Sequence, residues 1–301
     1  MFKNIRDLFL VGVGFIQSLF KLILWRPDVV FTKGGYVCLP VGIAAKLLRI
    51  PLVIHDSDAH PGLTNRILSR WATAIATGAP LEYYPYDPNK STYVGIPIAS
   101  QFVPYTEEQK VSAKAEWGVA LDRPLIVATG GGLGAGRINM TVAHTLPELQ
   151  KRGSVVLIAG AGQYDELRAE LPPDSEDFQL YPFVSNMHSL LGAADVVVTR
   201  AGATTILELA ALRKPTILIP NAKLTGGHQL KNAAVYEQAH AVAVVDEEKM
   251  LDQPELLLHA VIDILDHPQE SQQMAERFHA FSKPNAAKDM ASLIISARRT
   301  V

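Results

Sequence analysis

Short apolar runs of four or five residues alternate along the chain with longer stretches of helical periodicity. The apolar runs lie at 28–32, 52–55, 73–76, 125–128, 155–159, 196–199, 216–219 and 241–245. Helical stretches separate them, as at 137–151, 203–212 and 228–238. Apolar strands joined by helices form parallel sheets that are covered on both faces. The sequence therefore predicts an α/β protein with doubly wound parallel sheets.

A break near residues 95–106 divides these runs into two series. The tripeptide 95–97 ends the first series, and Pro104 precedes Thr106, which can cap a helix. The 301 residues are enough for two domains. We expect two Rossmann-like domains, at 1–100 and 101–301. The first opens with a helix and offers only three or four strand candidates, so we expect it to be incomplete.

The charge balance excludes a broad nucleic-acid-binding surface. Lys and Arg number 28 against 30 Asp and Glu, a formal net charge of −2. Any anion must therefore be held by a local site, and no nucleic-acid partner is expected. The single cysteine, Cys38, excludes an intrachain disulfide framework and a multi-cysteine metal site.

The first apolar stretch, 8–24, allows three interpretations. It is interrupted by Gln17 and Lys21 and is at the short limit for a membrane span. Lys3 and Arg6 before it would also suit a signal peptide, but no small-residue cleavage site follows. We favour an amphipathic helix that is buried or faces a membrane.

The strongest local motif is the glycine-rich run 130–139, which lies between a strand and a helix. Five glycines at 130–136 let the backbone approach a ligand and turn its amide groups outward. The following helix adds the partial positive charge of its N-terminus. No Gly-Lys-Ser/Thr sequence follows, so the loop is not a P-loop. It is predicted to bind a diphosphate, and the alternative is a tight strand-to-helix turn.

Two later loops also follow strands. The first is the segment 199–208. Its Glu208 lies about one turn into the next helix, where a carboxylate can accept hydrogen bonds from a ribose diol. In the second, 220–233, two glycines precede His228 and Gln229, which can contact sugar hydroxyls or phosphate. Read alone, Glu208 is equally a solvated helix charge, and His228 is a helix cap or surface residue.

The first half contains similar turns, at 34–37 and 55–65, each after a predicted strand. Parallel sheets bind ligands at the carboxyl ends of their strands, so these turns predict a second binding edge. One edge in each half indicates an enzyme with a donor and an acceptor. The histidines and aspartates at 55–60 form only a weak zinc pattern, and no metal is expected.

Taken in order, these motifs resemble the MurG family of peptidoglycan N-acetylglucosaminyltransferases. The resemblance covers nearly the whole chain and depends on 27–30, 34–37, 55–65, 94–97, 130–139, 200–203 with Glu208, and 228–233. It implies a GT-B fold of two Rossmann-like domains and no cofactor. It also implies an inverting transfer of GlcNAc from UDP-GlcNAc to a lipid-linked MurNAc-pentapeptide, which converts lipid I to lipid II.

The resemblance assigns site residues as well. Those on the donor side are Gly130, Gly131, Gly132, Leu133, Gly134, Ala135, Val184, Met187, Ala203, Thr204, Thr205, Glu208, His228 and Gln229. Val184 and Met187 would hold the uracil and Glu208 the ribose. His228 and Gln229 would contact the GlcNAc. Those on the acceptor side are Gly34, Gly35, Tyr36, Val37, Asp58 and Asn65.

The family also implies a membrane surface as a partner. Apolar residues of the first helix, such as Phe15, Leu19 and Phe20, would hold the protein peripherally on the cytoplasmic face of the cell membrane.

Three departures from the family pattern matter. Gly132 stands where members have a hydroxyl, and Ile96 and Ala99 stand where they have Asn and Arg. Members also begin with a strand and a glycine-histidine loop that supplies acceptor contacts and a candidate general base. Nothing in this sequence corresponds to that stretch, so we expect an N-terminally truncated sequence: a fragment, a misplaced start, or half of a split enzyme whose partner chain supplies the segment. The general base is not assignable, and His55 and Asp56 are the weak candidates.

Two other functions stay open at this point. One is a non-catalytic or partner-dependent subunit that binds UDP-GlcNAc. The other is a related GT-B enzyme with another lipid acceptor, or a UDP-GlcNAc 2-epimerase, although the motifs at 34–37 and 55–65 weigh against an epimerase. A purely structural protein would leave the aligned glycine loops unexplained.

Overall fold

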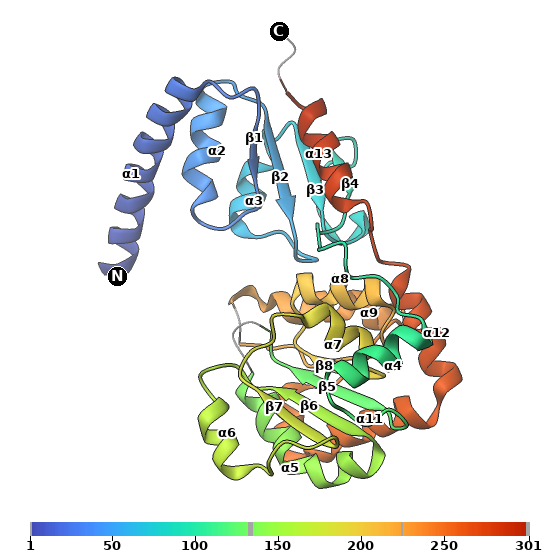
Figure 1. Cartoon of the computed structure of the whole chain (residues 1–301). Coiled ribbons are helices and arrows are strands. Elements are labelled where there is room, and N and C mark those ends of the chain that lie inside the picture. Colours follow the sequence, from blue (N-terminus) through green and yellow to red (C-terminus); the bar gives the residue numbers. More distant parts are fainter. Residues whose placement is uncertain (1, 132–134, 224, 299–301) are drawn as a thin grey trace. The chain divides into compact units, whose positions relative to one another are not determined.

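The computed structural model describes residues 2–131, 135–223 and 225–298 and forms two compact units (Figure 1). The first unit comprises residues 1–97 and 283–301, and the second comprises 98–282. Among the described residues, the strands of both units pair in parallel throughout. The predicted α/β class with parallel sheets is therefore confirmed.

The first unit is built on a sheet whose described strands run in the order β1-β2-β3-β4. Its elements are α1 (Phe2–Trp25), β1 (Val30–Thr32), α2 (Cys38–Leu47), β2 (Leu52–Asp56), α3 (Leu63–Leu68), β3 (Ala74–Thr77), the 3-10 helix η1 (Leu81–Tyr83), β4 (Ser91–Tyr93) and α13 (Ala286–Ser296). Successive residues of β2 face opposite sides of the sheet. Leu52 and Ile54 join the core under α1, α2 and α3, while Val53 faces α13.

Helix α13 lies in a different unit from the one that the sequence predicted. That interpretation assigned all of 101–301 to the second domain, but α13 packs in the first unit. Ala286 and Met290 contact Ala76 and Val94, and Ala297 packs with the core around Val53. The physical reason is that β2 and β3 are apolar on both faces, so the face opposite α2 also needs a helix to cover it.

The amphipathic helix predicted at the N-terminus is confirmed as α1, with a correction to its faces. Phe15 and Leu19 are partly buried against the core and Leu22 is part of it, whereas Phe20 and Ile16 are exposed. Within the described part of the chain, no helix is both long and apolar enough to cross a membrane.

The second unit is built on a sheet with the described strand order β10-β9-β8-β5-β6-β7. Its strands are β5 (Leu125–Thr129), β6 (Ser154–Ile158), β7 (Phe178–Tyr181), β8 (Val196–Thr199), β9 (Thr216–Leu218) and β10 (Ala243–Val244). Its helices are α4 (Glu107–Glu116), α5 (Gly136–Arg152), α6 (Tyr164–Glu170), α7 (Met187–Ala193), α8 (Ala203–Leu212), η2 (Thr225–Gly227), α9 (His228–Gln238), α10 (Glu247–Asp252), α11 (Glu255–Asp266) and α12 (Pro268–His279).

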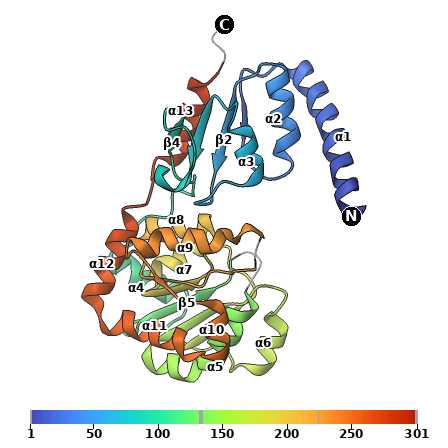
Figure 2. The same cartoon turned by 180° about the vertical axis from the view of Figure 1, so that it is seen from behind.

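Helices α5, α10 and α11 pack together beside this sheet (Figure 2). Ile126 and Val198 of the sheet share one core with Ile138 of α5 and Val261 of α11. Elsewhere in the unit α7 packs against both α4 and α8, and α8 also packs against α12.

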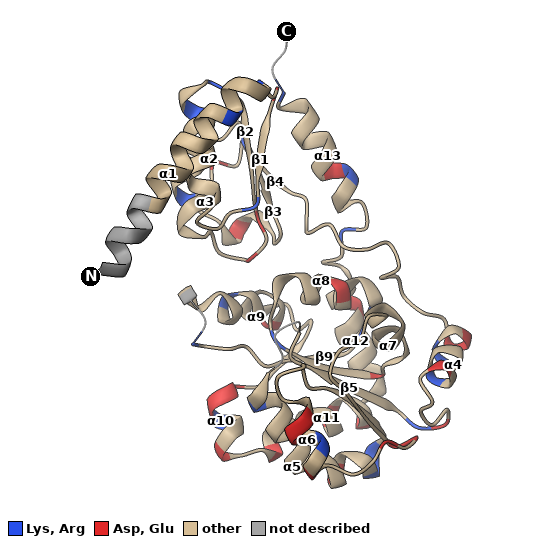
Figure 3. Ribbon diagram, turned by 60° about the vertical axis from the view of Figure 1, so that its left-hand side comes forward, with Lys and Arg blue, Asp and Glu red and all other residues tan. Residues whose placement is uncertain are grey.

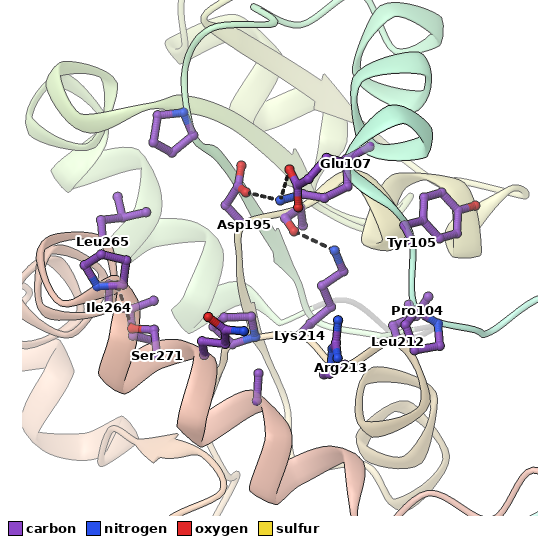
Figure 4. A pocket seen from close by; sticks show the side chains of 17 residues that line it. Pro104, Tyr105, Glu107, Asp195, Leu212, Arg213, Lys214, Ile264, Leu265 and Ser271 are labelled. Atoms are coloured by element: carbon purple, nitrogen blue, oxygen red, sulfur yellow. Dashed lines mark hydrogen bonds and ion pairs between the residues drawn. The ribbon is translucent and has the colours of Figure 1, made fainter.

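At the amino ends of β5, β8 and β9, a cluster of charged residues ties α4 to the sheet beside a pocket of about 450 Å³ (Figure 4). Asp195 accepts hydrogen bonds from Lys110 Nζ at 2.8 Å, Lys114 Nζ at 2.9 Å and the Leu125 amide at 2.8 Å. Lys214 Nζ donates to the carbonyls of Gly192 and Ala194 at the end of α7. This edge is opposite to the one that carries the glycine loops.

Burial raises the pKa of the Asp195 carboxyl, but the hydrogen bonds and charges of Lys110 and Lys114 outweigh it, so the net pKa lies below the usual value. We expect Asp195→Asn to lower the free energy of unfolding by roughly 3 kcal/mol, because the buried ammonium of Lys114 and the partly buried ammonium of Lys110 lose their carboxylate. Urea unfolding measures the difference, and Asp122→Asn at an exposed position is the control.

A folded-state pKa below the unfolded value of about 3.9 means that the contribution of Asp195 is complete at neutral pH and disappears as the pH falls through the folded pKa. The stability difference between the parent chain and Asp195→Asn should therefore shrink in acid. A loss no larger than that of Asp122→Asn at pH 7 would show that the cluster is not a stabilising one.

Candidate functional site

A cavity of about 560 Å³ opens where β5, β8 and β9 end, and we call it the polar cavity because charged and polar side chains line it together with glycine backbone. Parallel strands place their carboxyl ends at one sheet edge, so loops distant in the sequence meet there. The predicted donor residues that line this polar cavity are Gly130, Gly131, Ala135, Thr205 and Gln229. Loop residues Gly202, Asn221 and Lys223 also line it.

An apolar cavity of about 410 Å³ adjoins the polar one, since Gly131 and Thr205 line both. Its walls include Ile158, Ala161 and Leu191. The predicted residues Val184, Met187 and Glu208 also line it. A flat apolar group and a charged group could thus occupy adjacent compartments.

The remaining predicted donor residues fall in three places. Gly132, Leu133 and Gly134 lie outside the described residues. Ala203 and Thr204 begin α8 beside Thr205 but do not line either cavity. His228 begins α9 next to Gln229 and likewise does not line them.

Backbone geometry at the polar cavity suits an anion. Gly131 has a φ of +74°, a left-handed conformation that favours glycine, and its amide donates to Thr129 Oγ1. Helix α8 starts after Gly202 and α5 starts after Ala135, and neither start has a side-chain cap. Amide groups of both helix N-termini therefore remain for a ligand on the cavity wall.

A buried charge cluster lies at the polar cavity that the sequence interpretation did not identify. Glu247 of α10 is 3% exposed and forms ion pairs with Arg137 of α5 and Arg200 of the β8–α8 loop. All three line the cavity. Both arginines stand within motifs that the sequence singled out, but Glu247 follows Asp246 in a run of acidic residues that is typical of a solvated helix start.

Glu208 faces the apolar cavity, and burial raises its pKa to about 7. Phe183 is another residue that the sequence interpretation missed, and it lines this cavity with 70% of its surface exposed. An exposed aromatic ring at the wall of an apolar compartment is available to stack on a planar ligand.

In the first unit, the predicted acceptor-side residues gather where β1 and β2 end. Asn65 Nδ2 donates to the His55 carbonyl at 2.9 Å and to Asp56 Oδ1 at 2.8 Å. Gly34 has a φ of +82°, and a Cβ there would lie 3.1 Å from Asn65 Nδ2, so the two turns approach closely. Asp58 follows in the same turn and is half-buried.

Gly35 shares the left-handed conformation of Gly34, with a φ of +80°. Tyr36 and Val37 follow it and are well exposed. This edge therefore offers an open turn with apolar and aromatic side chains next to a rigid polar network.

His55 and Asp56, the candidate bases, are interior. His55 is fully buried, and its Nε2–H donates to the Gly95 carbonyl at 2.9 Å while Nδ1 accepts from Ser57. Burial lowers the pKa of His55 to about 4 against the opposing effect of the Gly95 hydrogen bond, so the ring is neutral at pH 7. This geometry favours a structural role for His55.

Asp56 is equally engaged. Its carboxylate accepts hydrogen bonds from Asn65 and from the Tyr86 hydroxyl. Burial raises its pKa, and the hydrogen bonds of Tyr86 and Asn65 act in the opposite direction. Both side chains thus hold the turn in place, and no general base is assigned. Among the described residues, no group of three or more His, Cys, Asp and Glu side chains could hold a metal ion.

Two doubly wound parallel units, each with glycine turns at the carboxyl ends of its strands, are the architecture of the GT-B class. Residues 125–290 match the glycosyltransferase family 28 C-terminal domain, and residues 1–77 match the family 28 N-terminal domain. A curated relative from Thermoanaerobacter sp. (strain X514) is 35% identical over 299 residues, which are 97% of this chain and 80% of the relative.

That relative is named UDP-N-acetylglucosamine--N-acetylmuramyl-(pentapeptide) pyrophosphoryl-undecaprenol N-acetylglucosamine transferase. The chain belongs to this family, the MurG family within glycosyltransferase family 28. The resemblance seen in the sequence is therefore confirmed.

Solved structures agree on the fold. A crystal structure of MurG from Acinetobacter baumannii gives a TM-score of 0.74 at 24% identity, covering 94% of this chain and 77% of that one. The UDP-GlcNAc 2-epimerase from Neisseria meningitidis bound to UDP-GlcNAc gives 0.66 at 13% identity, covering 95% and 81%. At these identities both show the GT-B fold alone.

Proposed function

We propose that this chain transfers GlcNAc from UDP-GlcNAc to a lipid-linked MurNAc-pentapeptide, converting lipid I to lipid II for peptidoglycan. The observation that carries the proposal is the pair of adjoining cavities at one edge of the second sheet. Their division into an apolar and a polar compartment matches the two ends of a nucleotide sugar, a base with its ribose and a diphosphate with its sugar.

The donor can be placed by chemistry. The uracil lies in the apolar cavity against Val184 and Met187, with Phe183 available to stack on it. Glu208 accepts hydrogen bonds from the ribose diol. The diphosphate lies at the starts of α5 and α8, and the GlcNAc extends toward Gln229.

The chemistry that follows is an inverting displacement at the anomeric carbon. The acceptor hydroxyl attacks, its proton passes to a general base, and the bond to the UDP oxygen breaks. The second unit contributes the leaving-group side, because amide dipoles at the starts of α5 and α8 stabilise the negative charge that develops on UDP. We place the acceptor at the turns 34–37 and 58–65 of the first unit.

Membrane attachment through the first unit completes the proposal. Ile16, Phe20 and Leu24 lie at spacings of four on α1, and each is more than 60% exposed, which gives one apolar stripe. In the sequence, the first unit holds 14 Lys and Arg against 7 Asp and Glu, whereas the second holds 14 against 23. Figure 3 marks the charged residues of the described part of the chain. An apolar stripe on a basic unit favours peripheral binding to anionic lipids, at the cytoplasmic face where the family is expected to act.

Transfer is tested by incubating the chain with UDP-GlcNAc and the lipid-linked MurNAc-pentapeptide. We expect release of UDP and a product one GlcNAc heavier. We also expect calorimetry to show tighter binding of UDP-GlcNAc than of UDP-glucose or ADP. Binding without transfer would favour a partner-dependent subunit. Conversion of UDP-GlcNAc without any acceptor would favour an epimerase.

The raised pKa of Glu208 predicts pH-dependent donor binding. The ionised carboxylate is the form that accepts from the ribose, and a pKa of about 7 leaves about a tenth of it ionised at pH 6 and about nine tenths at pH 8. The affinity for UDP-GlcNAc should therefore rise about tenfold from pH 6 to pH 8. Calorimetry measures it, and the diphosphate diester of this ligand does not titrate in that range.

Glu208→Gln should bind UDP-GlcNAc more weakly at pH 8, by roughly 1–3 kcal/mol, and should lose the pH dependence. Glu166→Gln, on the exposed part of α6, serves as the matched control. An unchanged slope in Glu208→Gln would remove this side chain from the ribose site.

The apolar stripe predicts the response to vesicles. Phe20→Glu should reduce binding to vesicles that contain anionic phospholipid by at least about tenfold, since it removes a ring that would insert into the bilayer and adds a charge that anionic lipids repel. Met140→Glu changes an equally exposed apolar residue of the second unit and should have little effect. Equal losses in both variants, measured by vesicle sedimentation, would argue against attachment through α1.

A further inference from the structure

The cluster of Glu247, Arg137 and Arg200 contains more positive charge than the buried carboxylate needs. Glu247 Oε1 pairs with Arg200 Nη2 in a short contact, and Glu247 Oε2 lies 3.2 Å from Arg137 Nη1. A buried carboxylate requires a partner, but one guanidinium is sufficient to neutralise it. The second guanidinium leaves one net positive charge on the wall of the polar cavity.

The two arginines are not equivalent. The Arg200 side chain is 10% exposed, and its Nη1 donates to the Ile219 carbonyl at 3.1 Å, so both ends of its fork are engaged in the interior. The Arg137 side chain is 28% exposed and lies on the first turn of α5. Arg200 therefore neutralises Glu247, and Arg137 is the cation that remains for a ligand.

Unfilled hydrogen-bonding capacity lies next to this cation. Arg137 Nη1 is near Glu247 but forms no hydrogen bond of good geometry among the described residues. Thr199 Oγ1, on the wall of the same cavity, is also buried without a described hydrogen-bond partner. Buried donors are rarely left unpaired, so these groups indicate a polar ligand in the cavity.

Glu247 is fixed independently of any ligand. The Asp246 side chain caps α10 by accepting from the amides of Glu248 and Lys249, both at 2.9 Å, which holds Glu247 at the first position of the helix. The carboxylate thus connects α10 with α5 and with the loop after β8. A rigid carboxylate restricts a long flexible side chain and lowers the entropy lost when that side chain binds.

We propose that Arg137 binds the diphosphate of a nucleoside diphosphate sugar in the polar cavity, and that Glu247, neutralised by Arg200, is the positioning residue for its guanidinium. The proposal rests on the proposed donor function. It assigns the diphosphate countercharge to a side chain, in addition to the amide dipoles of the helix starts. A planar guanidinium suits this role because its fork matches two phosphate oxygens.

The test compares UDP with uridine, which has the same base and ribose but no phosphate. Arg137→Met keeps the apolar stem of the side chain and removes its charge. We expect it to lower the affinity for UDP 10- to 100-fold, while the affinity for uridine stays within twofold of the parent chain. The UDP affinity of Arg137→Lys should lie between those of the parent chain and Arg137→Met, because lysine keeps the charge but lacks the planar guanidinium. Lys151→Met, which removes an exposed cation at the far end of α5 and outside the cavity, should change UDP affinity less than threefold.

The positioning role has its own readout. If Glu247 acts through Arg137, Glu247→Gln alone should lower the affinity for UDP more than that for uridine. In the Arg137→Met background it should have no further effect on either affinity. Additive losses in the double variant would overturn the coupling and leave Glu247 as a structural ion pair.

The outcomes separate this inference from the proposed function. A parent chain that binds neither uridine nor UDP would refute the donor site itself. A parent chain that binds both, with Arg137→Met losing uridine and UDP equally or losing neither, would overturn only the assignment of Arg137. A steeper fall of UDP affinity with salt in the parent chain than in Arg137→Met would support it.

Discussion

Parallel strand pairing is the constraint on which the rest of this structure depends. A parallel neighbour can be reached only by a crossover that returns the chain to the start of the sheet, so each strand is followed by a helix. As a result, the segments after β5, β8 and β9 begin at one edge although nearly a hundred residues separate the first from the last. Each segment contributes one part of the polar cavity, and none of them would form a site alone.

The same edge carries backbone amides that have no acceptor within their own helices. The first amides of α5 and α8 have no intrahelical acceptors, and neither helix start carries a side-chain cap. The opposite edge is organised differently. There Asp195, Lys110 and Lys114 satisfy one another and the backbone around them. Among the described residues, one edge of the sheet is therefore closed by internal partners, and the other carries helix-start amides without a side-chain cap, which a ligand or water can satisfy.

How much of this could be predicted depended on how strongly each residue's burial constrains its type. Strands β5 and β8, buried on both faces, are continuous apolar runs and were predicted to within a residue. The edge strands β4 and β7 were missed, because Ser91–Tyr93 is polar and partly exposed and Phe178–Tyr181 carries Gln179. Glycine turns identified the edge, since only a backbone that must approach something closely needs so many of them.

Long-range pairing was beyond sequence interpretation. The inward faces of α1 and α13 read only as apolar stripes, and no local pattern indicates that α13 covers Val53 and Ala74 more than two hundred residues earlier. The place of Glu247 in the site could not be predicted for the same reason. In the sequence it is one acidic residue among several, and only the packing of α10 brings it to Arg137 and Arg200.

The return of α13 to the first unit also sets an order of assembly. The second unit is one continuous segment, 98–282, and can complete its core as soon as that segment has left the ribosome. The first unit begins earlier but lacks the cover for Val53, Ala74 and Ala76 until α13 has been synthesised. During translation one apolar face of its sheet therefore stays uncovered until α13 emerges, so the unit that is synthesised first is the last to complete its core.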